Sequence, residues 1–324
     1  MHSESMGFHG HQTRRRFGQH WLKDQGVLDR IVAAADLQRQ DRVLEVGPGR
    51  GALTERLLAS PAGAVHAVEL DRDLVSGLKE RFGDEPRFSL QQGDVLELPL
   101  LLEDGAPAGK VVANIPYNIT TDILKTLLPM GDTFGDMVFM FQEEVARRLI
   151  RTDSGASDYR PMSVRVHFYS TPYYVRPVTA ACFDPPPNVE SCLVGFRPKP
   201  RRDLPELRGT EKQFFTFVQA CFAQKRKMLK NNLRAVCDDD TVTDALAMLG
   251  RDEKTRAQQL TMEEYVRLFN FVRERAPTSK GPRVVDGDAL KDSDAAIEKE
   301  SKSVREKRAR VERATSRPVA QAVG

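Results

Sequence analysis

The tetrapeptide Asn114-Ile-Pro-Tyr117 combines groups that can hold and activate the amine of an aromatic base. Such an amine is a poor nucleophile because its lone pair is delocalised into the ring. The side-chain oxygen of Asn114 and the backbone carbonyl beside Pro116 can accept its two N–H groups and favour a pyramidal nitrogen. Pro116 has a fixed φ and no amide hydrogen, and Tyr117 can stack on an unstacked base. The motif predicts group transfer to an exocyclic amine such as that of adenine, although it would also fit a purely structural turn.

A second aromatic side chain belongs to the proline-rich segment Phe183-Asp-Pro-Pro-Pro-Asn-Val-Glu-Ser191. Three consecutive prolines restrict this segment to a stiff loop. We expect Phe183 to cover the other face of the base that stacks on Tyr117. A hydrophobic plug beneath a rigid loop is the alternative interpretation.

The segment Val43–Gly51 reads as a strand that runs into a glycine-rich turn and then a helix. Gly47, Gly49 and the alanine three residues later also fit the dinucleotide pattern G-x-G-x-x-A. Two features disfavour a diphosphate there. Pro48 removes an amide donor, and Glu45 places a carboxylate that would repel phosphate but tolerate an ammonium or sulfonium. The turn therefore favours a cationic ligand.

Two further carboxylates follow the next two expected strands. Glu69 ends one of them, where a carboxylate can accept both hydroxyls of a ribose. Asp94 follows the other and can accept the exocyclic amine of an adenine, with Val95 as an apolar neighbour. Because ligands of doubly wound sheets bind outside the carboxyl ends of the strands, these positions converge. Together with the sulfonium-tolerant turn, they predict S-adenosylmethionine as the cofactor and methyl donor.

The elements that position these residues follow from the alternation of short apolar runs with amphipathic segments between residues 27 and 150. That alternation is typical of a doubly wound α/β sheet. The expected strands are Arg42–Val46, Ala64–Glu69, Arg87–Gln91, Lys110–Ala113 and Met137–Phe141. The expected helices are Gly51–Leu58, Asp73–Phe82, Thr121–Leu128 and Glu143–Arg151.

Two more strands, Ser163–Tyr169 and Ser191–Arg197, are expected to close this sheet as an antiparallel pair. From about 203 to 276 the periodicity predicts helices at Glu211–Phe222, Lys225–Ala235, Thr243–Leu249 and Thr261–Arg275. Thr261 and Glu264 have the spacing of a capping box before the last of them.

The formal net charge of +3 is too small to indicate a nucleic-acid partner by itself. Its distribution is more informative, because basic residues cluster at Arg14–Arg16, at Arg197–Arg202, and at Lys225–Lys227 with Lys230. Local patches of this kind can bind a phosphate backbone, although each also fits a solvated surface.

Composition narrows the class of protein further. No apolar run approaches the roughly 20 residues needed to span a bilayer, and the N-terminus lacks the apolar region of a secretory signal. We therefore expect a cytoplasmic protein without membrane association, with a short organelle-targeting stub for a plastid or mitochondrion left open. The four cysteines show no metal-binding spacing, so we expect free thiols and no metal.

Taken together, these segments resemble the adenine N6-dimethyltransferases of small-subunit ribosomal RNA, the kasugamycin-resistance methyltransferase family. The resemblance covers about residues 14–274. Besides the motifs above, it includes Arg16–Leu22, Asn114–Asn118, Phe222–Leu233 and Arg256–Leu260.

The resemblance implies a Rossmann-like S-adenosylmethionine methyltransferase sheet with a smaller C-terminal helical domain. It implies dimethylation of two adjacent adenines in a hairpin near the 3′ end of small-subunit ribosomal RNA. We expect the partner to be this RNA or the pre-ribosomal small subunit, and the protein to be a monomer. The chemistry of the motifs described above makes Asn114, Tyr117 and Phe183 the expected catalytic residues. The implied cofactor contacts are His20, Leu22, Gly47, Glu69, Asp94 and Asn114. Because His20 stands where the family commonly has Asn, we expect its contact through the backbone.

The expected domains are a flexible basic N-terminus at 1–16, the methyltransferase domain at 17–200, a helical RNA-binding domain at 201–276, and a charged tail at 277–324. The tail contains no aromatic residue, and its composition cannot bury enough apolar surface to offset the chain entropy lost on folding. We expect it to be mostly disordered.

Two alternatives share much of this pattern. Erythromycin-resistance methylases carry the same sheet motifs and act on large-subunit RNA, but the basic segment Gln224–Leu233 is similar to the small-subunit enzymes. Mitochondrial transcription factors use the fold to bind nucleic acid without methylating it. The complete set of cofactor positions beside Asn114–Tyr117 favours a working enzyme.

Overall fold

The computed structural model describes residues 20–98, 109–115, 119–152 and 158–275. The expectations for Arg14–Arg16, Tyr117 and the tail from residue 277 lie outside these ranges. The described chain divides into two compact units. The first contains the residues up to Glu206 together with Gln258–Val266, and the second contains Leu207–Ala257 and the residues from Arg267 on.

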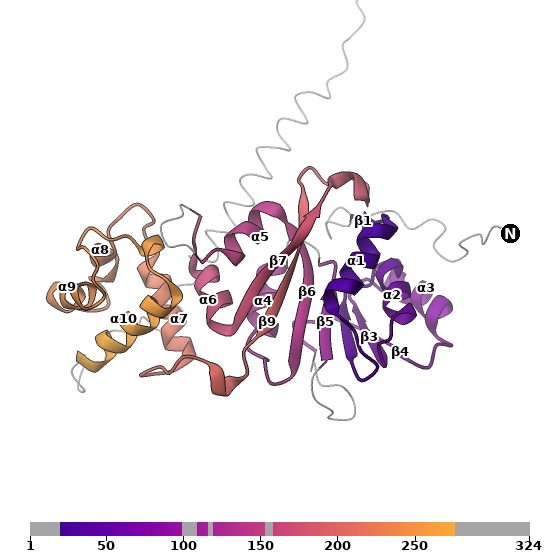
Figure 1. Ribbon diagram of the computed structural model, residues 1–324, viewed down its shortest axis with the longest axis horizontal. Coiled ribbons are helices and arrows are strands. Elements are labelled where there is room, and N and C mark those ends of the chain that lie inside the picture. Colours follow the sequence, from indigo (N-terminus) through magenta and orange to yellow (C-terminus); the bar gives the residue numbers. More distant parts are fainter. Residues whose placement is uncertain (1–19, 99–108, 116–118, 153–157, 276–324) are drawn as a thin grey trace, which may run out of the picture. The chain divides into compact units, whose positions relative to one another are not determined.

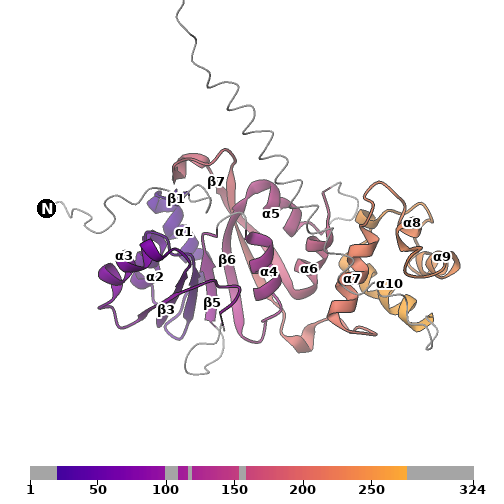
Figure 2. The same cartoon turned by 180° about the vertical axis from the view of Figure 1, so that it is seen from behind.

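A seven-stranded sheet forms the centre of the first unit, with strand order β4-β3-β2-β5-β6-β9-β7 (Figures 1 and 2). Its strands are β2 (Arg42–Val46), β3 (Ala64–Glu69), β4 (Phe88–Gln92), β5 (Gly109–Ala113), β6 (Phe134–Gln142), β7 (Ser170–Val178) and β9 (Ser191–Pro198). The strands from β4 to β6 are parallel neighbours, whereas β9 runs antiparallel to both β6 and β7. The doubly wound α/β fold is thus confirmed, and the carboxyl ends of β2 to β5 meet at one edge.

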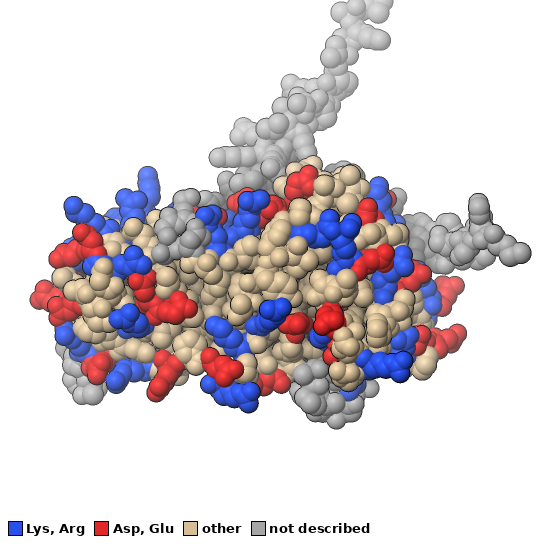
Figure 3. Space-filling model, viewed as in Figure 1, with Lys and Arg blue, Asp and Glu red and all other residues tan. Residues whose placement is uncertain are grey.

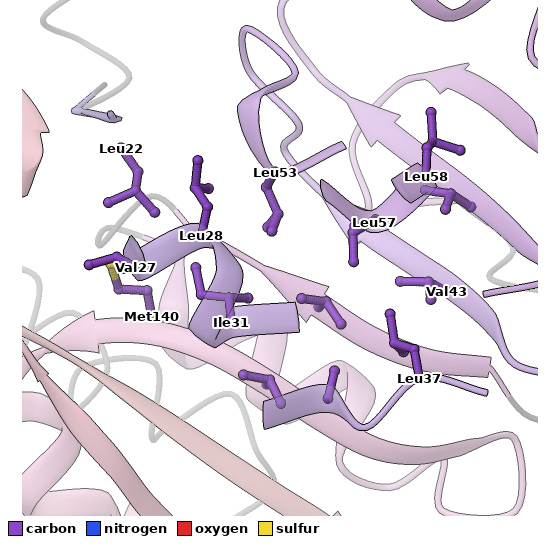
Figure 4. Packing of buried hydrophobic residues seen from close by; sticks show 14 of the residues in the cluster. Leu22, Val27, Leu28, Ile31, Leu37, Val43, Leu53, Leu57, Leu58 and Met140 are labelled. Carbon is purple, nitrogen blue, oxygen red and sulfur yellow. The ribbon is translucent and has the colours of Figure 1, made fainter. Parts of the chain in front are cut away.

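The helices of this unit are α1 (Gln25–Ala35), α2 (Ala52–Ala59), α3 (Arg72–Phe82), α4 (Thr120–Leu127), α5 (Glu143–Ile150) and α6 (Pro161–Tyr169). Helices α1 and α2 pack on each other. Leu28 and Leu57 belong to a hydrophobic cluster that also contains the strand residues Val43 and Met140 (Figure 4). Because side chains alternate along a strand, Phe139 on β6 faces the opposite side of the sheet. There it packs with Phe141 and Phe196 at ring-centroid distances of 5.9 Å each. Both faces of the sheet are therefore buried.

The strand expected at Ser163–Tyr169 is wrong, because this segment is helix α6. Alternating apolar and polar residues from Val164 to Phe168 imitate the period of a strand. Pro161 at the start fixes a helical φ, and Ser163 Oγ donates to the carbonyl of Arg148 at 2.8 Å. The antiparallel strand follows directly, as β7.

In the second unit, α7 (Glu211–Cys221), α8 (Leu229–Leu233) and α9 (Asp239–Met248) pack with the later part of α10 (Met262–Arg275). Phe269 of α10 contacts Phe214 and Phe217 of α7, with ring centroids 5.5 Å apart in both pairs. None of the helices in the described ranges is both long and apolar enough to cross a bilayer.

The helix expected at Lys225–Ala235 is wrong for its first half. Residues 222–228 form turns, and only Leu229–Leu233 is helical. Asn232 Nδ2 donates to the carbonyl of Cys221 at 2.6 Å and to that of Gln224 at 3.3 Å, so it holds the turn that ends α7. The basic residues 225–227 therefore lie on an exposed loop rather than on a helix.

The capping box expected at the start of α10 is confirmed. The amide of Thr261 donates to Glu264 Oε2 at 2.8 Å, and the amide of Glu264 donates to Thr261 Oγ1 at 3.3 Å. Thr261→Ala removes the hydroxyl and should lower the free energy of unfolding by about 1 kcal/mol. Thr261→Ser, which keeps the hydroxyl, should recover most of this loss in urea denaturation followed by circular dichroism. Equal stability of the Ala and Ser variants would show that the cap is unimportant.

Candidate active site

A cavity of about 400 Å³ opens at the carboxyl ends of β2, β3, β4 and β5. It has the size of a small-molecule site. Its walls include all of the expected site residues within the described ranges: His20, Leu22, Gly47, Glu69, Asp94, Asn114 and Phe183. Residues spread over more than 160 positions of the chain therefore gather around one cavity.

The glycine turn after β2 forms one wall of this cavity. The amide of Gly47 donates to the carbonyl of Val68 at 2.9 Å, which joins the ends of β2 and β3. The amide of Gly49 donates to Glu69 Oε2 at 3.0 Å. Gly49 has a φ of +61°, a left-handed conformation that favours glycine. The turn thus lies directly against the acidic residue that ends β3.

Glu69 is held in place by backbone groups. Besides the bond from Gly49, its Oε1 accepts the amide of Asp71 at 2.8 Å, and the side chain is largely buried. Burial raises the pKa of the Glu69 carboxyl, although the bonds from Asp71 and Gly49 act in the opposite direction. Each carboxylate oxygen has two acceptor sites, so both can still accept hydroxyl donors from a ligand.

Asp94 and Asn114 present polar side chains at the ends of β4 and β5, and both are half-buried. Asp94 Oδ1 accepts the amide of Leu96 at 2.9 Å, a bond that uses one of the two carboxylate oxygens. Val95, buried beside it, adds an apolar wall. Along the sheet the acceptors thus follow the order Asp94, Glu69, glycine turn, Asn114.

The segment at the N-terminal end of the described chain is fastened to the loop that carries Phe183. Strand β1 (Trp21–Leu22) pairs with β8 (Phe183–Asp184), and Leu22 lies opposite Phe183. His20 Nδ1 donates to the carbonyl of Pro185 at 2.8 Å. The His20 ring thus joins the two segments. Phe183 is only 1% exposed and belongs to the hydrophobic core while lining the cavity, so its stacking on a base stays a prediction.

Trp21 and Arg50 are cavity residues that sequence reasoning missed. The indole lies on the glycine turn so closely that a Cβ at Gly49 would stand 2.5 Å from Trp21 Cζ3. The Arg50 guanidinium carbon lies 5.0 Å from the ring centroid, a cation–π distance. Trp21 is the only tryptophan of the chain, but nothing in the sequence indicates that it contacts a turn so distant along the chain.

Glu45 occupies the floor of the cavity at the end of β2. It is 1% exposed, and Thr54 Oγ1 donates to its Oε2 at 2.7 Å. Burial raises the pKa of Glu45 to about 8, and the charge of Glu69 adds to this shift. Burial thus favours the neutral form of this carboxyl group in the free protein, whereas the sequence-based interpretation treats Glu45 as an anion.

In the described part of the chain, no three His, Cys, Asp or Glu side chains gather in a way that could hold a metal ion. All four cysteines are free thiols, of which Cys192 and Cys221 are buried.

The packing of Trp21 on Gly49 generates a test by fluorescence. Gly49→Ala should displace the indole and shift its emission to longer wavelength, because the new methyl group would overlap the ring. Gly250→Ala is the matched control, since Gly250 also has a positive φ, of +68°, but open space where a Cβ would stand. Unchanged emission in Gly49→Ala would contradict the close approach of ring and turn.

Comparison with known proteins shows which proteins this chain resembles. The family model "Ribosomal RNA adenine dimethylase" matches residues 10–274. The chain is 51% identical over 269 residues to the ribosomal RNA small subunit methyltransferase A of Parasynechococcus marenigrum strain WH8102, covering 81% of this chain and 88% of that protein. It is 49% identical to the protein of the same name from Synechococcus sp. strain CC9902, covering 81% of this chain and 97% of that protein.

Two solved structures share the fold. A dimethyladenosine transferase from Plasmodium falciparum superposes with a TM-score of 0.65 at 26% identity, covering 77% of this chain and 96% of that one. The 23S rRNA methyltransferase ErmE superposes with a TM-score of 0.60 at 26% identity, covering 78% of this chain and 99% of that one. With a family match that spans most of its length, this chain belongs to the ribosomal RNA adenine dimethylase family.

Proposed function

We propose that this protein transfers methyl groups from S-adenosylmethionine to the N6 amines of two adjacent adenines in a hairpin near the 3′ end of small-subunit ribosomal RNA. The observation that carries the proposal is the gathering of Glu69, Asp94 and Asn114 around one cavity at successive strand ends. Membership of the adenine dimethylase family supports the reaction, and the names of the relatives that are about half identical support the small-subunit substrate.

The cavity fits the cofactor part by part. Asp94 and Val95 suit the adenine, and Glu69 suits the two ribose hydroxyls. The glycine turn with His20 and Leu22 suits the methionine portion. The sheet order supports this assignment, because β4, β3 and β2 lie side by side in the same sequence as the three parts of the cofactor. S-Adenosylmethionine supplies an electrophilic methyl group on a positively charged sulfur.

Catalysis then depends on positioning. Asn114 accepts an N–H of the target amine and holds its lone pair in line with the methyl group, while Tyr117 and Phe183 enclose the base. Alignment of this kind and exclusion of water provide most of the acceleration. The methylated amine is strongly acidic and passes its surplus proton to water. No metal and no strong general base are required.

Local basic patches provide the contacts to RNA phosphates. Acidic and basic side chains are interspersed on the face in Figure 3, so no large field of one sign dominates that view. Lys225, Arg226 and Lys227 are all exposed on the loop before α8, and Arg201 and Arg202 are exposed near the end of the first unit. We propose that residues 201–276 form the RNA-binding domain and that 17–200 form the methyltransferase domain, of a monomer without membrane contacts.

The proposed ribosomal substrate limits the cellular compartments in which the protein can act. We propose the bacterial cytoplasm, with a plastid or mitochondrion as the alternative, because each contains ribosomes of the bacterial type. The relatives reported above come from bacteria.

The similarity to ErmE makes a large-subunit substrate the second candidate function. The decisive experiment incubates the protein with labelled donor and with either immature small subunits or large-subunit RNA, followed by mass spectrometry of the nucleosides. N6,N6-Dimethyladenosine in small-subunit RNA alone is the expected result. Modification confined to large-subunit RNA would identify that RNA as the substrate instead. Absence of modification in both RNAs would contradict the proposed function.

Binding and transfer should be separable by mutation. Asn114→Ala should abolish methyl transfer while reducing cofactor affinity only moderately, because the side chain acts mainly on the target amine. Glu69→Ala should weaken cofactor binding by roughly 1–3 kcal/mol through loss of hydrogen bonds to a charged acceptor. Calorimetry and single-turnover assays measure the two effects. Full turnover by Asn114→Ala would contradict the proposed mechanism.

The exposed basic loop should determine the salt dependence of RNA binding. Replacing Lys225, Arg226 and Lys227 with Gln should weaken binding to the immature subunit and lower the slope of log affinity against log salt by up to roughly 3. Substituting the exposed residues Arg39, Arg72 and Lys79 in the same way provides a control of equal charge change. Equal slopes in the two triple variants would show that the loop does not contact phosphates.

A further inference from the structure

Glu45 is a buried carboxyl group that the proposed chemistry leaves without a role. It lines the cavity at the end of β2 and is 1% exposed. Thr54 Oγ1 donates to one of its oxygens, whereas no hydrogen-bond donor among the described residues reaches the other oxygen, Oε1. Buried polar atoms are rarely left unpaired, so Oε1 indicates a partner that arrives from outside the chain.

The electrostatic surroundings of Glu45 favour a cationic partner. Helix α2 contributes Thr54, which is uncharged, and β3 contributes Glu69, whose charge repels that of Glu45. The other ionisable side chains that line the cavity are those of His20, Lys23, Arg50, Asp71 and Asp94. None of these is among the causes that set the ionisation of Glu45. In the described chain, therefore, no cation compensates a negative charge on Glu45.

We propose that Glu45 recognises the positive charge by which the methyl donor differs from its demethylated product. The carboxyl group releases its proton to water when the cationic donor occupies the cavity, and it takes up a proton from water when the uncharged thioether is left. Glu45 thereby favours entry of the donor and departure of the product. This inference rests on the proposed function, since it assigns a selecting residue within the same cavity.

The energetics of ionisation agree with this role. Burial holds the pKa of Glu45 at about 8 in the free protein, so the protonated form is favoured at pH 7. An opposite charge close to a carboxyl group favours the ionised form and lowers the pKa. Binding of the donor at pH 7 should therefore release up to about one proton from Glu45, and binding of the product should release much less.

The direction of the pH dependence follows from this linkage. The free protein binds more protons at Glu45 than the donor complex does, so donor affinity should rise with pH from neutrality and level off above about 8. The rise should reach up to about tenfold per pH unit at most. Affinity for the product should change little over the same range, so the ratio of donor to product affinity should increase.

Calorimetry of the protein without RNA tests the proposal. S-Adenosylmethionine and S-adenosylhomocysteine are titrated at pH 7 into buffers of different ionisation enthalpy, which gives the number of protons released by each. Native protein is compared with Glu45→Gln and with Glu80→Gln, an exposed carboxylate on α3 as matched control. Titration of the ligand amine contributes equally in all three proteins, so the difference between variants isolates Glu45.

The expected result is that native protein and Glu80→Gln release clearly more protons with the donor than with the product, and that Glu45→Gln loses this difference. Glu45→Gln should also lower the ratio of donor to product affinity severalfold. Equal proton release by native protein and Glu45→Gln overturns the inference but leaves the proposed function intact. Failure of the native protein to bind either ligand refutes the proposed function itself.

A second variant decides the matter if Glu45→Gln does not fold. The hydrogen bond from Thr54 lowers the pKa of Glu45, so Thr54→Val, which keeps the side-chain shape, should raise that pKa. The pH at which donor affinity levels off should then move upward, while product affinity remains flat. An unshifted profile in a folded Thr54→Val protein overturns the inference.

Discussion

The hydrogen bond from the amide of Gly49 to Glu69 Oε2 connects the main parts of the active site. It joins the glycine turn after β2 to the acidic residue that ends β3, and it requires the left-handed backbone that Gly49 adopts. The same glycine provides the surface on which Trp21 lies. Since Trp21 belongs to strand β1, which pairs with β8, the turn is also linked through Trp21 to the segment that carries Phe183.

The second constraint is the burial of two carboxyl groups in one cavity. Glu45 and Glu69 both have raised pKa values because burial disfavours their charged forms, and the charge of Glu69 further raises the pKa of Glu45. Glu69 is compensated by backbone amides, whereas Glu45 has only the Thr54 hydroxyl. A ligand with ribose hydroxyls and a positive charge would satisfy both groups. The cavity therefore favours a ligand that supplies the hydroxyl donors and the positive charge that the described protein groups do not provide.

Much of this arrangement follows from the sequence, because buried parallel strands are marked by apolar runs and their ends by the polar residues that follow them. The boundaries of β2 and β3 were predicted correctly, and so was the capping box of α10. The prediction of a strand at 163–169 is wrong because its apolar residues alternate, whereas Pro161 and the hydrogen bond of Ser163 to Arg148 favour a helix. The short extent of α8 depends on contacts of Asn232 with the end of the preceding helix, and local periodicity does not reveal such contacts. The same is true of the stacking of Arg50 on Trp21, which joins residues that are distant in the chain.

The central claim is that the carboxyl edge of the sheet holds an adenosyl cofactor beside Asn114. The most direct measurement is a crystal structure of the protein with S-adenosylhomocysteine. The account predicts ribose hydroxyls on Glu69, the adenine amine on Asp94, and the sulfur facing Asn114. A cofactor bound elsewhere on the protein, or bound here in the reverse orientation with its adenine beside Asn114, would contradict it.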